Sequence, residues 1–219
     1  MTIESPTDEG LTRRHQATAA IGAFTATGEL PRLREALTDG LDAGLTISEI
    51  KEILIQMYAY AGFPRSLNGL GTFMALLEER RTNGSSDPTG ADPTPLAAGT
   101  NILDVGTDNQ TRLAGAPVTG PLFDFAPTID EFLKTHLFGD IFTRDNLDWP
   151  SREVATVAAL AALGGVESQL QSHLGIALNI GLTETDLRAL VTVMRTRVGQ
   201  APGDRLGDIL DRVLADRRG

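Results

Sequence analysis

The stretch DAGLTISEIKEILIQM, residues 42–57, has a second version 137 residues later in NIGLTETDLRALVTVM, residues 179–194. The Gly-Leu-Thr turn is identical in the two versions, and the apolar positions after it match in register. The same shift, without a gap, aligns the apolar segment 17–26 with 154–163. Self-similarity at a fixed interval is typical of a chain built from copies of one structural unit. We therefore predict two copies, roughly at 11–82 and 148–217.

The periodicity of the first copy is helical. Ile50, Ile53, Leu54, Met57 and Ala61 follow the spacing of one face of an amphipathic helix. Runs that alternate β-branched and polar residues, as strands do, are scarce. The fold class predicted is all-α, with two tandem pseudo-symmetric multi-helix units. Each unit alone is small for burying its apolar faces, so we expect the two to pack as a pseudo-twofold pair.

Helix boundaries are marked by capping residues and prolines. Thr46 or Ser48 is expected to cap the helix after Gly44, and Asp148 to begin another with Pro150 just inside. Further helices are expected at about 64–81 and 128–137. The Gly-, Pro- and Ser-rich stretch 83–100 is predicted to be a linker. The domain prediction is then a first repeat at 11–82, and a second at 101–217 with an N-terminal extension.

Composition excludes several kinds of chemistry. The 219 residues include no cysteine, so disulfides, thiolate metal sites and cysteine nucleophiles are ruled out. A net charge of −10 argues against nucleic acid or an anionic membrane as the partner. The N-terminal residues lack the pattern of a secretory signal, and the most apolar run, 154–166, is short for the ~20 residues of a membrane span. We expect a soluble, cytoplasmic protein.

Three stretches resemble a known family. SREVATVAALAALGGVESQLQSHLGIALNIGLT, residues 151–183, resembles the carboxymuconolactone decarboxylase family, and its γ-carboxymuconolactone decarboxylase branch most of all. The preceding FAPTIDEFLKTHLFGDIFTRDNLDWPSRE, residues 125–153, is similar to the segment before the core of that branch. EIKEILIQMYAYAGFPRSLNGLGTFMALLEER, residues 49–80, looks like the C-terminal part of the same unit.

The resemblance carries expectations about fold, activity and assembly. It implies an alkylhydroperoxidase D-like fold in a tandem two-copy chain. It implies a decarboxylase that acts on a small carboxylated lactone, without a metal or prosthetic group. It also implies a homo-oligomer, here a trimer of tandem chains that imitates a hexamer. The related peroxidases need a cysteine pair, which this chain does not have.

Two catalytic residues are implied by the resemblance, Glu153 and His173. At the matching positions the first copy has Gln16 and Ala36. From the residues alone each has a structural explanation: an acid in a first helical turn gains from the helix dipole, and a lone histidine is commonly a packed residue. The resemblance favours an acid–base pair.

Five further residues are candidates for contacting the substrate: Arg65, Tyr60, Asn68, Gln169 and His136. Arg65 has the geometry to hold a carboxylate, or alternatively to pair with Glu78 or Glu79. Gln169 shares a helical face with His173, and His136 follows an apolar stretch near the same region, or serves as a histidine at a helix C-terminus.

The copies have also diverged in a complementary way, which suggests one site shared between them. The first copy keeps Tyr60 to Arg65 and the second keeps Glu153 and His173. Tyr58 and Tyr60, two residues apart, cannot both face one side of a helix. His15 is expected at the surface.

Two other classes of function stay open at this point. One is a lyase or isomerase acting on another enolisable ring acid, with the same Glu and His as a proton shuttle. The other is a non-catalytic oligomer that binds a small hydrophobic molecule.

Overall fold

The computed structural model describes residues 10–218. In this range the chain is helical and forms no strand, so the all-α prediction is confirmed. The first part of the chain forms α1 (Arg13–Thr27), α2 (Leu30–Asp42), α3 (Ile47–Gln56), α4 (Tyr58–Ala61) and α5 (Phe63–Thr82). A middle part forms α6 (Ile102–Ala114), α7 (Pro121–Phe125), α8 (Pro127–Phe132) and the π-helix η1 (Leu133–Ile141). The last part forms α9 (Trp149–Leu163), α10 (Glu167–Asn179), α11 (Glu184–Val193), the π-helix η2 (Met194–Val198) and α12 (Gln200–Asp216).

The helix bounds recur at the interval seen in the sequence. Both ends of α2 and α10 differ by 137 residues, and so do both ends of α3 and α11. Thr46 and Thr183 cap the latter two helices in the same way: each hydroxyl accepts the backbone N–H of an acid three residues on, and that acid's side chain accepts the N–H of the cap. This reciprocal capping fixes where each helix begins.

The turn after the first helix of each repeat is also the same. Gly28 ends α1 with a φ of 75°, and Gly165 follows α9 with a φ of 73°. This left-handed conformation is one that glycine adopts without steric cost. The sharp reversal lets α2 and α10 fold back beside the helices that precede them.

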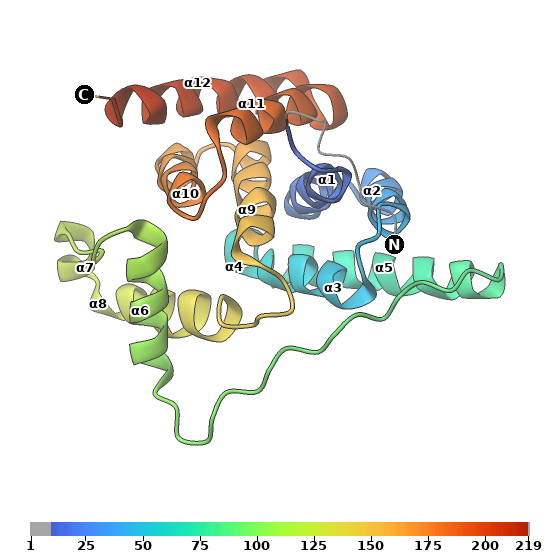
Figure 1. The fold of residues 1–219 in the computed structure, drawn as a ribbon, viewed down its shortest axis with the longest axis horizontal. Helices are drawn as coiled ribbons and strands as arrows, with labels where there is room; N and C mark the ends of the chain where they lie inside the picture. The colour runs from blue at the N-terminus through green and yellow to red at the C-terminus, as the bar shows by residue number, and fades with distance from the viewer. Residues whose placement is uncertain (1–9, 219) are drawn as a thin grey trace, which may run out of the picture.

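Helices α1 and α9 lie against each other at the centre of the molecule (Figure 1). Both are buried over most of their length and are rich in alanine, which permits close approach of the two backbones. The α3–α5 helices lie on one side of this central pair, and α11 and α12 on the other (Figure 1). One apolar core draws side chains from both repeats, and its burial is the main source of stability.

The middle segment makes a separate layer, at the left of Figure 1. Here α6 packs along η1 around a smaller apolar cluster that also takes in Ile176 of α10. The helix expected at 128–137 is α8 continued by η1 as far as Ile141, so the predicted end was four residues short and missed the change to π-helical bonding. Helix α6 was not predicted.

Residues 85–97 form no helix or strand; they leave the end of α5, pass α3 and then run away from the first repeat toward α6 (Figure 1). The backbone N–H groups of Ile47 and Ser48 donate to the carbonyls of Pro88 and Thr89, each at 2.9 Å. Further along, the Thr94 N–H donates to Asp145 at 2.8 Å. The segment between the repeats is thus fastened at several points.

None of the helices between residues 10 and 218 combines the length and the apolar character needed to cross a membrane.

Candidate active site

The structure brings Glu153 and His173 into direct contact. Glu153 lies on the second turn of α9, which Asp148 caps as expected by accepting the Ser151 N–H at 2.7 Å. His173 lies in the middle of α10 and faces α9. Its Nδ1 is 2.8 Å from Oε2 of Glu153, and both side chains are buried. With the carboxylate ionised, Nδ1–H donates to it, which fixes the tautomer and the orientation of the imidazole.

The other polar atoms of these two side chains make no hydrogen bond within the described residues. The Glu153 Oε1 is fully buried and has no hydrogen-bond partner among residues 10–218. The His173 Nε2 likewise makes no hydrogen bond to the described part of the chain, and it is not one of the fully buried unpartnered atoms. A histidine held at Nδ1 by a carboxylate, with Nε2 accessible, is arranged for general acid–base catalysis.

Tyr60 completes this group from the first repeat. Its ring and the ring of His173 pack edge to face, with 5.5 Å between the ring centroids and 79° between the ring planes. Its hydroxyl is buried near Thr156, whose own hydroxyl donates to the Arg152 carbonyl at 2.9 Å. Burial, with the charge of Glu153 adding to it, raises the pKa of Tyr60 above its usual value. The hydroxyl therefore keeps its proton and can donate a hydrogen bond.

Beside this group lies a buried polar network that the sequence analysis missed. Arg152 is fully buried and donates to Glu52 at 3.1 Å and to Gln56 at 3.0 Å. Arg144 binds Glu52 through two donor nitrogens, at 2.7–3.1 Å. Hydrogen bonds from these arginines hold the pKa of Glu52 below its usual value although burial acts to raise it.

This network joins α3 of the first repeat to α9 of the second. Gln56 also donates to the Arg152 carbonyl at 3.1 Å and to Thr156 at 2.7 Å. A sequence signal existed: Arg152 and Glu153 stand at the start of a run that is otherwise apolar, where a charge needs a partner. The position of that partner, about 100 residues earlier in the chain, could not be deduced.

His136 and Tyr58 form a second aromatic contact on the other side of α4. Their ring centroids are 5.4 Å apart, and Tyr58 also stacks on Phe63 at 4.4 Å. His136 is half exposed, with Nδ1 2.6 Å from Oδ2 of Asp140. The hydroxyls of Tyr58 and Tyr60 are both buried, facing these two different surroundings. A break in the helix at Met57 separates α3 from α4. Tyr58 and Tyr60 therefore both lie on the four-residue helix α4, and the expectation that they cannot face the same side of a helix applies to this short helix only.

Three of the residues predicted to contact the substrate do not contact Glu153 or His173. Arg65 is exposed, lies against Gly28, and forms no ion pair with a described residue. Asn68 is exposed on α5. Gln169 is exposed too, and accepts a hydrogen bond from Ser168 at 3.0 Å. The acids suggested as partners of Arg65 bind other arginines: Glu78 binds Arg81 and Glu79 binds Arg34.

His15, expected at the surface, is half-buried, and burial lowers its pKa. It stands at the position in α1 that corresponds to Arg152 in α9.

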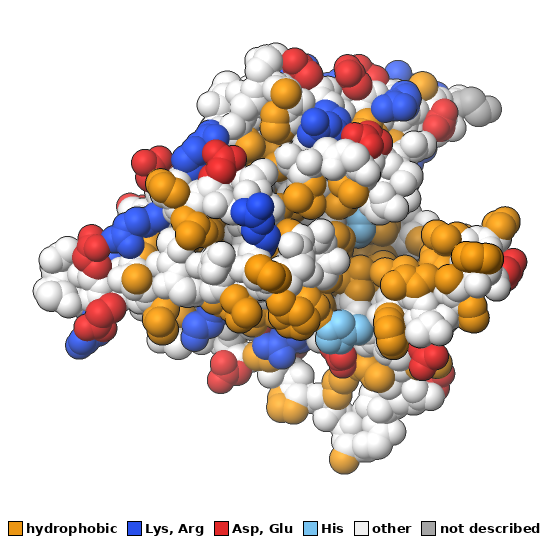
Figure 2. Space-filling model, turned by 180° about the vertical axis from the view of Figure 1, so that it is seen from behind, with side chains coloured by type: hydrophobic (Ala, Val, Ile, Leu, Met, Phe, Trp, Pro, Cys, Tyr) orange, Lys and Arg blue, Asp and Glu red, His pale blue; other side chains and the backbone are white. Residues whose placement is uncertain are grey.

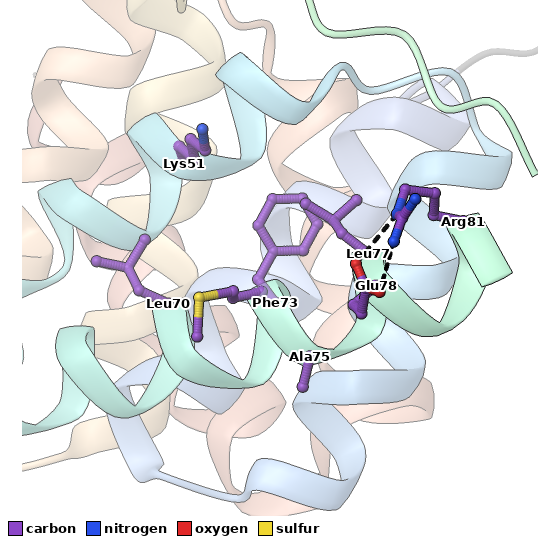
Figure 3. Close-up of a pocket in the computed structure, with 8 residues that line it drawn as sticks. Lys51, Leu70, Phe73, Ala75, Leu77, Glu78 and Arg81 are labelled. Atoms are coloured by element: carbon purple, nitrogen blue, oxygen red, sulfur yellow. Dashed lines mark hydrogen bonds and ion pairs between the residues drawn. The ribbon is translucent and has the colours of Figure 1, made fainter.

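A large cavity lies elsewhere, away from this pair. It measures about 820 Å³ and lies over α3 and α5, with Leu70, Phe73 and Leu77 along its floor (Figure 3). Lys51 stands at one side, and the Glu78–Arg81 ion pair closes an end. It contains neither Glu153 nor His173, and holds no acid–base pair. On chemical grounds the Glu153–His173 pair is the better candidate for the active centre.

One face of the molecule, the one seen in Figure 2, is hollowed. Figure 2 shows hydrophobic side chains on both sides of this hollow and histidine side chains at two places in it. An apolar recess with a few polar groups is the usual form of a small-molecule site. The fold and the site together define an all-α protein with a buried Glu–His pair.

Part of the chain is similar to known proteins. Residues 127–202 match the model of the Carboxymuconolactone decarboxylase family. Over 70 residues the chain is 33% identical to a 4-carboxymuconolactone decarboxylase of Acinetobacter baylyi. That alignment covers 32% of this chain and 52% of the relative, so the chain spans about half the length of the curated protein it matches. Residues 127–202 therefore belong to the carboxymuconolactone decarboxylase family, and the resemblance seen at 151–183 is confirmed.

Proposed function

We propose that the chain is a cofactor-independent decarboxylase of a small carboxylated lactone or a related enolisable acid. The observation that carries the proposal is the buried 2.8 Å contact between Glu153 and the Nδ1 of His173, which leaves Nε2 accessible. The family of residues 127–202 and the similarity to a named decarboxylase support the reaction type.

Decarboxylation without a cofactor makes a carbanion and then protonates it. As the bond between the substrate carbon and its carboxylate breaks, CO2 leaves and the electron pair passes into the conjugated carbonyl system of the substrate. Protonated His173 then donates its Nε2 proton to that carbon, while Glu153 stabilises and orients the imidazolium. Solvent returns the proton to His173. The reaction consumes one proton and one substrate, and yields CO2 and the protonated product.

Tyr60 and the apolar surroundings assist at two points. The Tyr60 ring packs on the His173 ring, with 5.5 Å between the ring centroids, and so helps to hold the imidazole in place. A dry, apolar recess disfavours the charge of the substrate carboxylate in the ground state and eases its loss as CO2.

The test is CO2 release from a panel of carboxylated lactones and enolisable acids. Glu153→Gln and His173→Gln should each lower turnover by about 10²–10⁴-fold. The double variant should be little worse than either single variant, because the two act as one unit. His15→Gln and Glu167→Gln are matched controls that make the same chemical change away from the pair, and should leave turnover unaltered.

The outcomes separate the alternatives. Full activity in both Glu153→Gln and His173→Gln would refute the role of the pair. Turnover without CO2 release would indicate a lyase or isomerase that uses the same pair as a proton shuttle. Binding without any turnover would indicate a small-molecule-binding protein.

We further propose self-association, as a trimer of tandem chains. Apolar residues of α5 form an exposed or half-exposed stripe at helical spacing: Phe63, Leu67, Leu70, Met74 and Leu77. At the corresponding positions α12 has Gln200, Asp204, Gly207, Asp211 and Leu214. An apolar patch kept on one repeat and lost on the other supports burial by another chain. Solution scattering at micromolar concentration should give about three times the 23.3 kDa chain mass; a monomer would contradict the proposal.

A further inference from the structure

Gln56, the last residue of α3, is fully buried, and every hydrogen-bonding atom of its side chain is directed at α9. The amide nitrogen donates to the Arg152 carbonyl at 3.1 Å and to the Thr156 hydroxyl at 2.7 Å. The amide oxygen accepts from the Arg152 guanidinium at 3.0 Å. Both donor hydrogens and the acceptor are thus used. A buried amide satisfied in this way makes the contact between its two helices rigid and specific.

The two chain segments that this amide joins are the ones that carry the candidate centre. On α9, Glu153 follows Arg152 directly and accepts from the Nδ1 of His173 at 2.8 Å. On the other side, Tyr60 stands four residues after Gln56, and its ring packs on the His173 ring with 5.5 Å between centroids. Gln56 therefore fixes the carboxylate-bearing turn of α9 relative to the segment that supplies the tyrosine.

The second repeat shows the corresponding segment without this amide. The counterpart of Gln56 is Val193, whose apolar side chain makes no hydrogen bond, and α11 continues directly into the π-helix η2. There the Gly199 N–H donates to the carbonyl five residues earlier, at 2.8 Å, whereas its counterpart Gly62 donates to the carbonyl four residues earlier, at 2.9 Å. The side chain at the Tyr60 position thus stands on differently wound backbone in the two repeats.

We propose that Gln56 is a positioning residue of the Glu153–His173 centre. By fastening the end of α3 to α9, it holds the Tyr60 ring against the imidazole and keeps the imidazole in the orientation that Glu153 sets. Gln56 acts through Tyr60 and is not itself a catalytic residue. The inference rests on the proposed function of the pair. Its rival is a purely structural role, in which Gln56 only stabilises the contact between α3 and α9.

The test reads the ring protons of His173 in proton–carbon correlation NMR spectra of the full chain without substrate. The chain has three histidines, and His173→Gln identifies the signals. An aromatic ring in contact shifts the protons beside it, so Tyr60→Leu marks the position expected when that ring is removed.

Gln56→Met keeps the length of the side chain and removes its polar atoms. It should move the His173 signals in the same direction as Tyr60→Leu does. On the substrate that the CO2 assay identifies, it should lower kcat by up to about 10²-fold and change KM little, because the reacting groups are displaced while binding contacts stay.

Two further variants serve as rescue and control. Gln56→Glu keeps an acceptor for the Arg152 guanidinium, and the Thr156 hydroxyl can turn to donate to it, so the His173 signals and kcat should stay near those of the wild type. Gln16→Met makes the same change as Gln56→Met at the other interface between the repeats, where Gln16 donates to the Leu11 carbonyl. It should alter neither readout.

If Gln56→Met does not fold, Thr156→Val removes the 2.7 Å hydrogen bond alone and should give a smaller shift in the same direction. His173 signals at their wild-type positions in the variant that folds would overturn the inference. So would a loss of stability in Gln56→Met with unmoved signals, since Gln56 would then be structural only. The spectra need no turnover, so they decide this inference even if Glu153→Gln and His173→Gln keep full activity and the catalytic proposal fails.

Discussion

The two repeats meet at two corresponding interfaces, and only one of them contains the candidate chemistry. Where α3 and α4 face α9 and α10, the chain places Glu52, Gln56 and Tyr60 against Arg152, Glu153 and His173. At the other interface α11 and η2 lie against α1 and α2. There the counterparts of Glu52, Gln56 and Tyr60 are Ala189, Val193 and Arg197. The counterparts of Arg152, Glu153 and His173 are His15, Gln16 and Ala36.

The second interface has replaced acid–base groups with ordinary surface contacts. Gln16, at the position of Glu153, donates to the Leu11 carbonyl at 3.0 Å. Arg197, at the position of Tyr60, binds Asp39. Ala36, at the position of His173, has only a methyl group and can make no polar contact. Helix bounds, caps and turns thus recur at the 137-residue interval, while the candidate site residues do not.

The largest expected effect comes from breaking the polar network found at one interface alone. Glu52→Gln should destabilise the chain by about 3–5 kcal/mol, because buried Arg152 loses its carboxylate partner. Urea unfolding measures the loss. Glu78→Gln removes an exposed carboxylate that pairs with Arg81, and should change stability little, because solvent screens an exposed ion pair. Equal losses in the two variants would show that the network contributes nothing special.

The same carboxylate should make stability depend on acidity. The pKa of Glu52 is held below its ordinary value of 4.5 in the folded chain. The unfolded chain therefore binds its proton first as the pH falls. The stabilisation from Glu52 is fully present above about 4.5 and is lost as the pH falls through the folded-state pKa. The free energy of unfolding, measured between pH 7 and pH 3, should contain this pH-dependent loss in the wild type and not in Glu52→Gln.

The helix caps should respond alike in the two repeats. Thr46→Ala and Thr183→Ala each remove a reciprocal cap at the start of α3 or α11, and each should cost about 0.5–2 kcal/mol. Thermal or urea unfolding of the two variants measures the loss of stability in each. A cost confined to one repeat would mean that the caps are equivalent in geometry but not in energy.

The smallest effect expected is at His15, the residue that corresponds to Arg152. Burial lowers its pKa from 6.5, against the opposing charges of Asp148 and Asp186. The unfolded chain then binds this proton more readily, so stability should decline as the pH falls below about 6.5. His15→Gln should remove that decline. A stability curve between pH 7.5 and pH 5 that is unchanged by the substitution would contradict the assignment.

The sequence predicted backbone features better than long-range contacts. The 137-residue register, the Thr46 cap and the Asp148 start are all local patterns, and the helix bounds follow them. Helix α6 was not predicted, because Gly106 interrupts its helical pattern. That glycine is needed because a Cβ there would lie 1.7 Å from the Lys134 carbonyl oxygen on η1.

The site itself was predictable only in part. Glu153 and His173 are 20 residues apart on consecutive helices, so their contact follows from the family pattern. Arg65 could not be placed, because a long side chain at the start of α5 is free to lie toward α1 or toward the site. The Glu52–Arg152 pairing depends on how two distant helices pack, which no local pattern specifies.

The fastened linker has a consequence for the number of active centres. Because residues 85–97 connect the repeats within one chain, each repeat always meets the same partner at a high effective concentration. Two identical free subunits would build their shared centre twice, once at each interface. A fused pair is free to specialise; in the proposed centre one half supplies Tyr60 and the other supplies Glu153 and His173. Titration with a tight-binding inhibitor should therefore find one equivalent per chain, half the number that the duplicated architecture would suggest.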